Sequence, residues 1–95
     1  MNKIFKYPLK IGDIQMVEMP KGAAVLCVQT QRETPCLWAE VDPKAKTVCR
    51  SFVTYGTGHP MDDGPARHYV GTYQLQGGAL VFHVYTDRVE YPKGS

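Results

Sequence analysis

The sequence has no apolar run approaching the roughly 20 residues that a membrane-spanning helix needs. Its opening stretch, "MNKIFKYPLK", also lacks the apolar segment of a secretory signal peptide. Eleven basic and nine acidic side chains leave a formal net charge of +2, and they are scattered singly along the chain. Proteins that bind duplex nucleic acid usually carry a basic stripe or face. The sequence therefore predicts a protein that binds neither a membrane nor duplex nucleic acid.

Paired cysteines are also absent. The chain has three cysteines, Cys27, Cys36 and Cys49, with no C-x-x-C spacing. An odd number without such a pair argues against a disulfide framework and favours a reducing cytoplasm. Cys27 lies within an apolar run, where a free cysteine behaves as a small buried hydrophobic residue.

Little in the sequence favours a helix, because seven prolines and nine glycines stand mostly between short apolar runs. Seven β-branched or aromatic runs predict strands at residues 3–7, 14–19, 23–31, 36–41, 47–55, 68–75 and 79–86. We therefore expect an all-β fold, a small single-domain sandwich or partly open barrel of about seven antiparallel strands. Its strand-rich core would span about residues 3–86, with a tail at 87–95.

The last two predicted strands form a hairpin whose register can be derived. If Gly77 and Gly78 make a two-residue turn, three facing pairs follow: Leu75 with Leu80, Tyr73 with Phe82, and Gly71 with Val84. Directly opposed residues share a face, so these side chains and Tyr69 would face the core. Gly71 would leave space for a large neighbour or a bend. The other face carries Gln74, Thr72 and His83 among Val70, Val81 and Tyr85, which predicts partial cover by a second sheet or a sister subunit.

A long loop, "GTGHPMDDGPAR", joins the fifth and sixth predicted strands. Its twelve residues exceed the typical connection of about 4–6, and loops of this length tend to be functional or disordered. The dinucleotide fingerprint fails because Met61 stands where its third glycine would be, and the P-loop Gly-Lys-Ser/Thr is missing. Two interpretations stay open. The glycines serve a plain turn, or their backbone N–H groups converge on an anion.

The anion interpretation predicts a ligand site with four kinds of contributor. Loop N–H groups and the Thr57 hydroxyl would hold phosphate oxygens, His59 would donate a hydrogen bond, cations would pair with phosphate, and an aromatic ring would stack on a base. The predicted site residues are Gly56, Thr57, Gly58, His59, Arg67, Arg50, Trp38 and Tyr55. Trp38 is more simply a core or rim aromatic.

Metal binding and catalysis are weaker alternatives for the same loop. His59, Asp62, Asp63 and His68 lie within ten residues, but their spacing matches no standard ligand set, and an aspartate pair that caps a turn explains them more simply. His59 with Asp62 or Asp63 would suit hydrolysis, yet no serine lies nearby in the sequence. We therefore predict no metal, no cofactor and no catalytic residue.

The chain resembles a family of small, largely uncharacterised accessory proteins of tailed phages and prophages. The matching stretches are "YPL", "MPKGAAVLCVQTQ", "PCLWAEVDP", "GTGHP" and "YVGTYQLQGGALVFHV", in that order from Lys3 to Tyr85. The family signature includes residues 56–60, Trp38, Ala39, Gly71 and Thr72. The resemblance implies a phage origin and action in the host cytoplasm, and it brings no established chemistry.

Small phage accessory proteins often block a host defence system, by gripping one of its proteins or by sequestering its nucleotide signal. By this analogy we expect a non-catalytic protein that sequesters a small anionic, nucleotide-type ligand. The small core and the second apolar face predict a homo-oligomer, most simply a dimer. The alternatives are a protein–protein inhibitor that uses Tyr55, Tyr69 and Tyr91, or a virion or packaging accessory protein.

Overall fold

The computed structural model describes residues 1–61 and 67–94. Within these ranges the chain forms seven strands and one short 3-10 helix: β1 Lys3–Pro8, β2 Ile14–Pro20, β3 Ala24–Gln31, β4 Thr34–Val41, β5 Thr47–Gly56, β6 His68–Leu75, η1 Gln76–Gly78 and β7 Leu80–Pro92. The predicted all-β fold of seven antiparallel strands is confirmed. The described residues include no helix with the length and apolar character of a membrane span.

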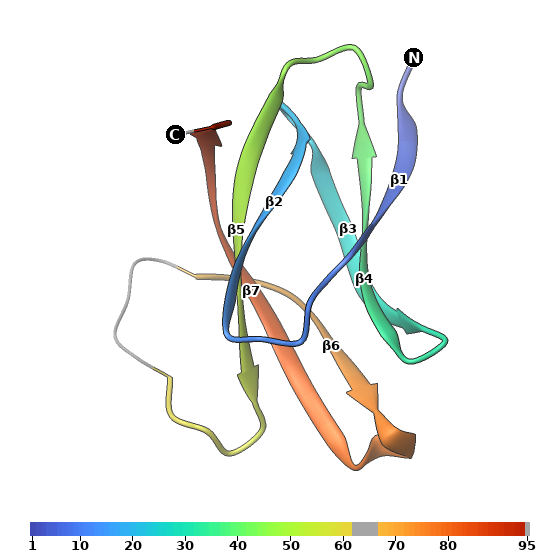
Figure 1. Ribbon diagram of the computed structural model, residues 1–95, viewed down its shortest axis with the longest axis vertical. Coiled ribbons are helices and arrows are strands. Elements are labelled where there is room, and N and C mark those ends of the chain that lie inside the picture. The colour runs from blue at the N-terminus through green and yellow to red at the C-terminus, as the bar shows by residue number, and fades with distance from the viewer. Residues whose placement is uncertain (62–66, 95) are drawn as a thin grey trace.

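The strands form two antiparallel sheets packed as a sandwich (Figure 1). One sheet has the order β1-β4-β3, and the other has the order β2-β5-β7-β6. The two sheets approach closely where β3 meets β6, because a Cβ atom added to Gly71 would lie only 2.7 Å from Cγ1 of Val28. Gly71 therefore leaves space for a large neighbour, as its position in the hairpin predicted, and Val28 fills that space.

The core between the sheets follows the two-residue period of a strand. Leu37 and Ala39 are fully buried, whereas Trp38 between them is only partly buried. In β5 the even-numbered side chains from Val48 to Thr54 point inward and are buried, while the odd-numbered ones are less so. Burying one large apolar side chain such as Phe52 contributes about 1.5–3 kcal/mol, so this alternation fixes which face of β5 is left for a ligand.

The predicted register of the last hairpin is confirmed in its three derived pairs, Leu75 with Leu80, Tyr73 with Phe82, and Gly71 with Val84. The N–H of Ala79 donates to the carbonyl of Gln76 at 3.2 Å and closes the turn. Gly77 and Gly78 between them have φ values of 65° and 96°, the left-handed conformation that a two-residue hairpin turn requires.

The prediction for Tyr69 was wrong, because the hairpin contains a bulge. The register shifts between Tyr69 and Gly71, so Tyr69 pairs with Tyr85 rather than with Thr86. Tyr69 consequently lies on the outer face of the sheet with 58% of its surface exposed. Val70, expected on the second face, packs against the core instead. One extra residue in a bulge is enough to reverse such an assignment.

The seventh strand is longer than predicted and continues through residues 87–92, which the sequence analysis left as a tail. Arg50 pairs with Glu90, and Phe52 pairs with Thr86, so a wide bulge of β7 lies opposite Ser51. Arg88 within this bulge has φ 61°, an uncommon conformation for a residue with a side chain. The charged residues of the bulge interrupt the apolar pattern, and for this reason the sequence pattern did not predict the last residues of the strand.

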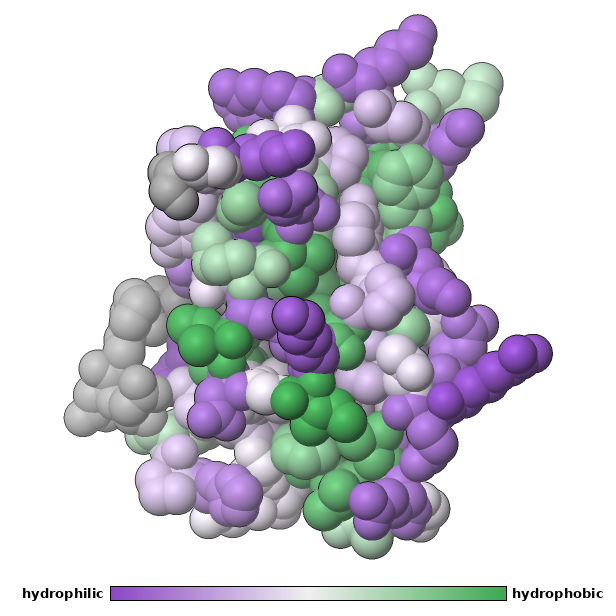
Figure 2. All heavy atoms as spheres, viewed as in Figure 1, coloured by the Kyte–Doolittle hydropathy of each residue, from purple (hydrophilic) through white to green (hydrophobic). Residues whose placement is uncertain are grey.

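Several hydrophobic side chains remain at the surface (Figure 2). Ile14 and Met16 in β2 are 68% and 52% exposed, and they pair with Val53 and Ser51 of β5. Directly opposed residues share a face, so both lie on the outer face of the four-stranded sheet. This outer face is therefore partly apolar along β2.

Candidate functional site

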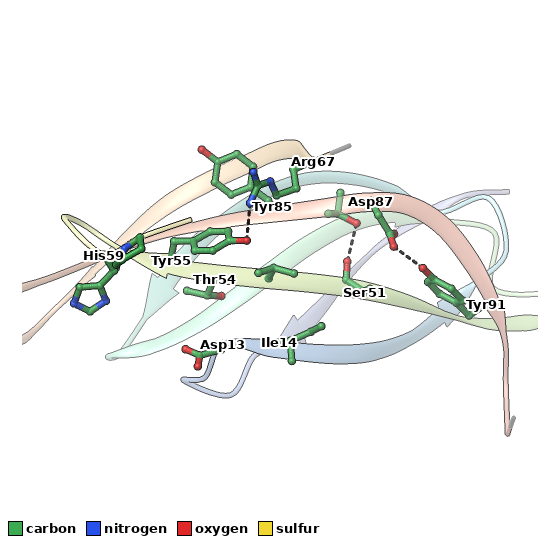
Figure 3. A pocket seen from close by; sticks show the side chains of 14 residues that line it. Asp13, Ile14, Ser51, Thr54, Tyr55, His59, Arg67, Tyr85, Asp87 and Tyr91 are labelled. Atoms are coloured by element: carbon green, nitrogen blue, oxygen red, sulfur yellow. Dashed lines mark hydrogen bonds between the residues drawn. The ribbon is translucent and has the colours of Figure 1, made fainter. Parts of the chain in front are cut away.

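A groove of about 710 Å³ lies against the outer face of the four-stranded sheet (Figure 3). The start of β2, the middle of β5 and β7, and the two described ends of the long loop form its walls. We call it the outer groove. Its lining residues are Asp13, Ile14, Ser51, Val53, Thr54, Tyr55, Gly56, His59, Pro60, Arg67, Tyr85, Thr86, Asp87 and Tyr91.

Three tyrosine rings form a row across this outer face. The ring centroids of Tyr55 and Tyr85 are 5.9 Å apart, and those of Tyr85 and Tyr69 are 5.5 Å apart. Both pairs pack edge to face, the arrangement that aromatic quadrupoles favour. The row brings aromatic surface from β5, β6 and β7 to one place. Tyr55 and Tyr85 line the groove itself.

Arg67 brings a cation to the same place. Its Nη1 donates a hydrogen bond to the Tyr55 hydroxyl at 2.8 Å, and its Cζ lies 5.5 Å from the Tyr55 ring centroid. A guanidinium at this distance from a ring is attracted by the ring face. The side chain thus comes from the end of the long loop and is held beside the Tyr55 ring.

The loop start is a tight turn that brings His59 to the groove. The N–H of His59 donates to the carbonyl of Gly56 at 3.0 Å, and Gly58 has φ 85°. A Cβ atom on Gly56 would lie 2.8 Å from Nδ1 of the exposed His59 ring, so a side chain there would displace the imidazole. Both glycines therefore have a steric role in the turn. These two glycines therefore serve a tight turn, as the first of the two interpretations predicted.

Thr57 lies beside the groove rather than in its lining. Its Oγ1 is 2.7 Å from Nε2 of His83, and Nδ1 of His83 is 2.9 Å from Oγ1 of Thr72. Thr72 Oγ1 in turn contacts the Tyr69 hydroxyl. The Thr57 N–H donates to the carbonyl of Val81 at 3.1 Å. These bonds fasten the loop to β7, and the Thr57 hydroxyl is committed to His83 rather than turned toward a ligand.

The structure does not bring Arg50 and Trp38 to the groove. Arg50 points between the sheets and is only 7% exposed, whereas Tyr55 points outward from the same strand. Residues five apart in a strand face opposite sides, so the sequence period alone could have separated them. Trp38 lies in β4, in the other sheet, opposite Lys6 and Cys27. Of the predicted site residues, the groove unites Tyr55, Gly56, His59 and Arg67.

The other end of the groove is acidic. The Tyr91 hydroxyl donates to Oδ2 of Asp87 at 2.5 Å, and Figure 3 shows this pair far from His59. The hydrogen bond to Asp87 raises the pKa of Tyr91 first, with desolvation and the negative charge of Asp87 acting in the same direction. The lining thus combines two carboxylates, Asp13 and Asp87, with the guanidinium of Arg67.

Sequence reasoning missed Asp13 and Asp87, and it named Tyr91 only as an aromatic of the protein–protein alternative. Asp13 is placed by a bond between distant segments, since its carbonyl accepts the Thr54 N–H at 2.8 Å. No local pattern signals such a pairing. Asp87 and Tyr91 were assigned to a tail, so their approach to β5 was not foreseen. Tyr85 was assigned to the second apolar face, which is where it lies.

The metal alternative gains no support from the described ranges, which contain no cluster of three or more His, Cys, Asp or Glu side chains suited to an ion. Asp62 and Asp63 lie outside the described residues. His59 lines the outer groove, whereas His68 lines a different pocket between the sheets. The two histidines of the metal alternative therefore line different pockets.

Comparison with known families gives a match over residues 1–94 to the family described as "Domain of unknown function (DUF7352)". The chain belongs to this family. No curated protein matches the chain. No solved structure matches it either. The match covers both sheets and the groove, so membership applies to the whole sandwich, and it assigns no activity to it.

Proposed function

We propose that this protein binds a small anionic ligand of nucleotide type in the outer groove and does not transform it. The observation that supports this most is the contact between Arg67 and Tyr55 beside Tyr85. A cation held against half-buried aromatic rings offers one partner for a phosphate and another for a base. A groove of about 710 Å³ is within the usual size of small-ligand sites, about 300–1,000 Å³.

Each proposed role follows from the chemistry of a side chain that lines the groove. Arg67 pairs with phosphate oxygens, and His59 donates a further hydrogen bond to phosphate or ribose. Tyr55 and Tyr85 contact the base through their rings. Asp87 accepts hydrogen bonds from an amino group of the base or a hydroxyl of the ribose, because an ionised carboxylate is a pure acceptor.

The hydrogen bonds of the Thr86 and Thr57 hydroxyl groups support binding without turnover. Thr86 Oγ1 donates to the carbonyl of Ser51 at 2.8 Å. The imidazole that contacts the Thr57 hydroxyl belongs to His83, which is outside the groove lining. Within the described lining, no hydroxyl bonds to His59, the base nearest to the groove. A pairing of this kind is the usual way in which a serine or threonine nucleophile is activated. Sequestration needs only affinity.

For the biological setting, we propose an accessory protein of a tailed phage that counters a host defence in the host cytoplasm. This part depends on the sequence resemblance alone. We also propose a homodimer formed through the outer face, because exposed Ile14 and Met16 adjoin the groove there. Two grooves brought together in this way would enclose a ligand more completely than one.

A thermal-shift panel of linear and cyclic nucleotides tests the proposal. A ligand at about 100 times its Kd stabilises a fold by roughly 2.7 kcal/mol, which is several degrees of Tm for a domain of this size. Arg67→Gln and His59→Gln should each weaken the affinity for a nucleotide found in the panel about tenfold or more, because each removes a hydrogen bond to a charged phosphate. Arg32→Gln, at the exposed β3–β4 turn, is the matched control and should bind normally. Equal affinity in all three variants would place the ligand elsewhere.

A second candidate function is inhibition of a host protein through the same face. The exposed side chains of Ile14, Met16 and Tyr69 favour it, since apolar and tyrosine side chains form the anchors of protein interfaces. It predicts no Tm shift with any nucleotide in the panel. It also predicts one stoichiometric host protein in a pull-down, lost when Met16→Ser and Tyr69→Ser are combined.

A further inference from the structure

A second pocket, of about 480 Å³, opens between the two sheets on the opposite side of β5 and β7 from the outer groove. We call it the inter-sheet cleft. Its lining contains three basic side chains and one acidic one, Arg50, His68, Arg88 and Glu90. Residues 22–26, where β3 begins, form the facing wall. The cleft thus has two guanidinium groups and one carboxylate in its lining.

Arg50 is buried there with few partners. It is 7% exposed, and its Nη1 donates one hydrogen bond, to the carbonyl of Ala23 at 3.3 Å. Its Nε is buried without a hydrogen-bond partner. Among the described residues no carboxylate lies within ion-pair distance of it. A buried guanidinium with one long bond is costly unless another group satisfies its donors.

Glu90, the acidic residue of the cleft, is committed elsewhere. Its Oε2 accepts the Gly22 N–H at 2.6 Å, so the carboxylate is held by the turn between β2 and β3. Although Glu90 pairs with Arg50 in the strand register, the two side chains form no ion pair. The guanidinium of Arg50 can therefore form an ion pair with an anionic group that enters the cleft.

The bulge of β7 adds a second guanidinium at the rim. Arg88 is exposed and has φ 61°, and its N–H donates to Oγ1 of Thr86 at 3.4 Å. The next N–H, of Val89, donates to Oδ1 of Asp87 at 3.0 Å. A residue held at positive φ by such bonds, next to a bulge, is common where a side chain must be aimed at a site.

We propose that the inter-sheet cleft binds a small anion that carries a phosphate group. Arg50, which lines the cleft, donates to the phosphate through its guanidinium N–H groups, whose planar fork suits phosphate oxygens. Arg88 closes the site from the rim, and His68 adds a third donor. The volume accommodates a phosphomonoester as well as free phosphate. This site is separate from the outer groove and does not depend on the function proposed there.

Inorganic phosphate and ribose 5-phosphate are the probes. Titrated against chloride at equal ionic strength, each should raise the Tm of the wild-type protein by several degrees once it is well above its Kd. Binding measured by calorimetry should weaken about tenfold in Arg88→Gln, which removes a charged donor from the surface and leaves the core intact. Lys10→Gln, which removes the same charge outside the cleft lining, is the matched control and should bind like the wild type.

Two further variants test the interior of the site. Glu90→Gln should bind phosphate more tightly, because it removes a like charge and keeps an oxygen for Gly22. Arg50→Lys should keep a buried cation but lose the forked geometry, and thus weaken binding with little loss of Tm. Arg67→Gln, in the outer groove, should leave phosphate binding unchanged, which separates this proposal from the first.

Either of two results would overturn the proposal. The first is the same Tm in phosphate as in chloride. The second is binding that Arg50→Lys and Arg88→Gln leave as strong as in the Lys10→Gln control.

Discussion

Thr57 and His83 are joined by a 2.7 Å contact between Oγ1 and Nε2, which ties the long loop to β7. The other imidazole nitrogen, Nδ1, lies 2.9 Å from Oγ1 of Thr72 in β6. A neutral imidazole can donate from one nitrogen and accept at the other, so one side chain connects the loop to two neighbouring strands. The position of His59 in the groove depends on this anchor, because Thr57 and His59 belong to the same turn.

His83→Ala should therefore release the loop and lower the free energy of unfolding by about 1–2 kcal/mol, the usual contribution of two hydrogen bonds. Urea denaturation measures the loss, and limited proteolysis should cut the chain faster near residue 58. His59→Ala is the control, since the turn uses its backbone N–H rather than its ring. Equal stability of the two variants would contradict the anchoring role.

Gly71→Ala should destabilise the sandwich by about 1–3 kcal/mol, because its Cβ would meet Val28 Cγ1 at 2.7 Å between the sheets. The same substitution in a Val28→Ala background should cost much less, since the contacting methyl group is then gone. Thermal unfolding of the two single variants and the double variant gives the coupling energy. Simple additivity would show that the sheets do not meet at this pair.

Tyr91 should ionise at a higher pH than an ordinary tyrosine, whose pKa is 10.0, because the Asp87 carboxylate accepts its hydrogen bond and repels the phenolate. The hydrogen bond stabilises the folded state fully below the ordinary pKa. That contribution is lost as the pH rises through the elevated pKa of Tyr91. Ultraviolet titration of tyrosinate should show one group moving toward lower pH in Asp87→Asn. An unchanged titration curve would contradict the contact.

Ile14→Asp should convert the proposed dimer to a monomer, because it places a charge on the exposed apolar part of the outer face. Light scattering at tens of micromolar would follow the mass. Leu26→Asp, at a residue 50% exposed in β3, is the control and should keep the wild-type mass. A monomeric wild-type protein would remove the dimer from the proposal and leave the groove as a site within one chain.

The parts of the fold that the sequence predicts well are those with local causes. The pairing of Leu75 with Leu80 needs only a two-residue turn and a strict alternation of side chains. Tyr69 escaped prediction because a bulge carries no sequence signature of its own. The sequence predicted part of the groove lining. Tyr55 and Arg67 flank one loop, whereas Asp13 reaches it through a pairing between β2 and β5 that nothing local determines.

The place of β7 in its sheet has a consequence for folding. Seventh along the chain, it is an inner strand, hydrogen-bonded to β5 on one side and to β6 on the other. During synthesis, β5 and β6 therefore cannot form their hydrogen bonds with β7 until residues up to Pro92 have left the ribosome. Such non-local pairing folds slowly and leaves strand edges open in the meantime. The outer groove and the inter-sheet cleft share β7 as a wall, so both form in this last step.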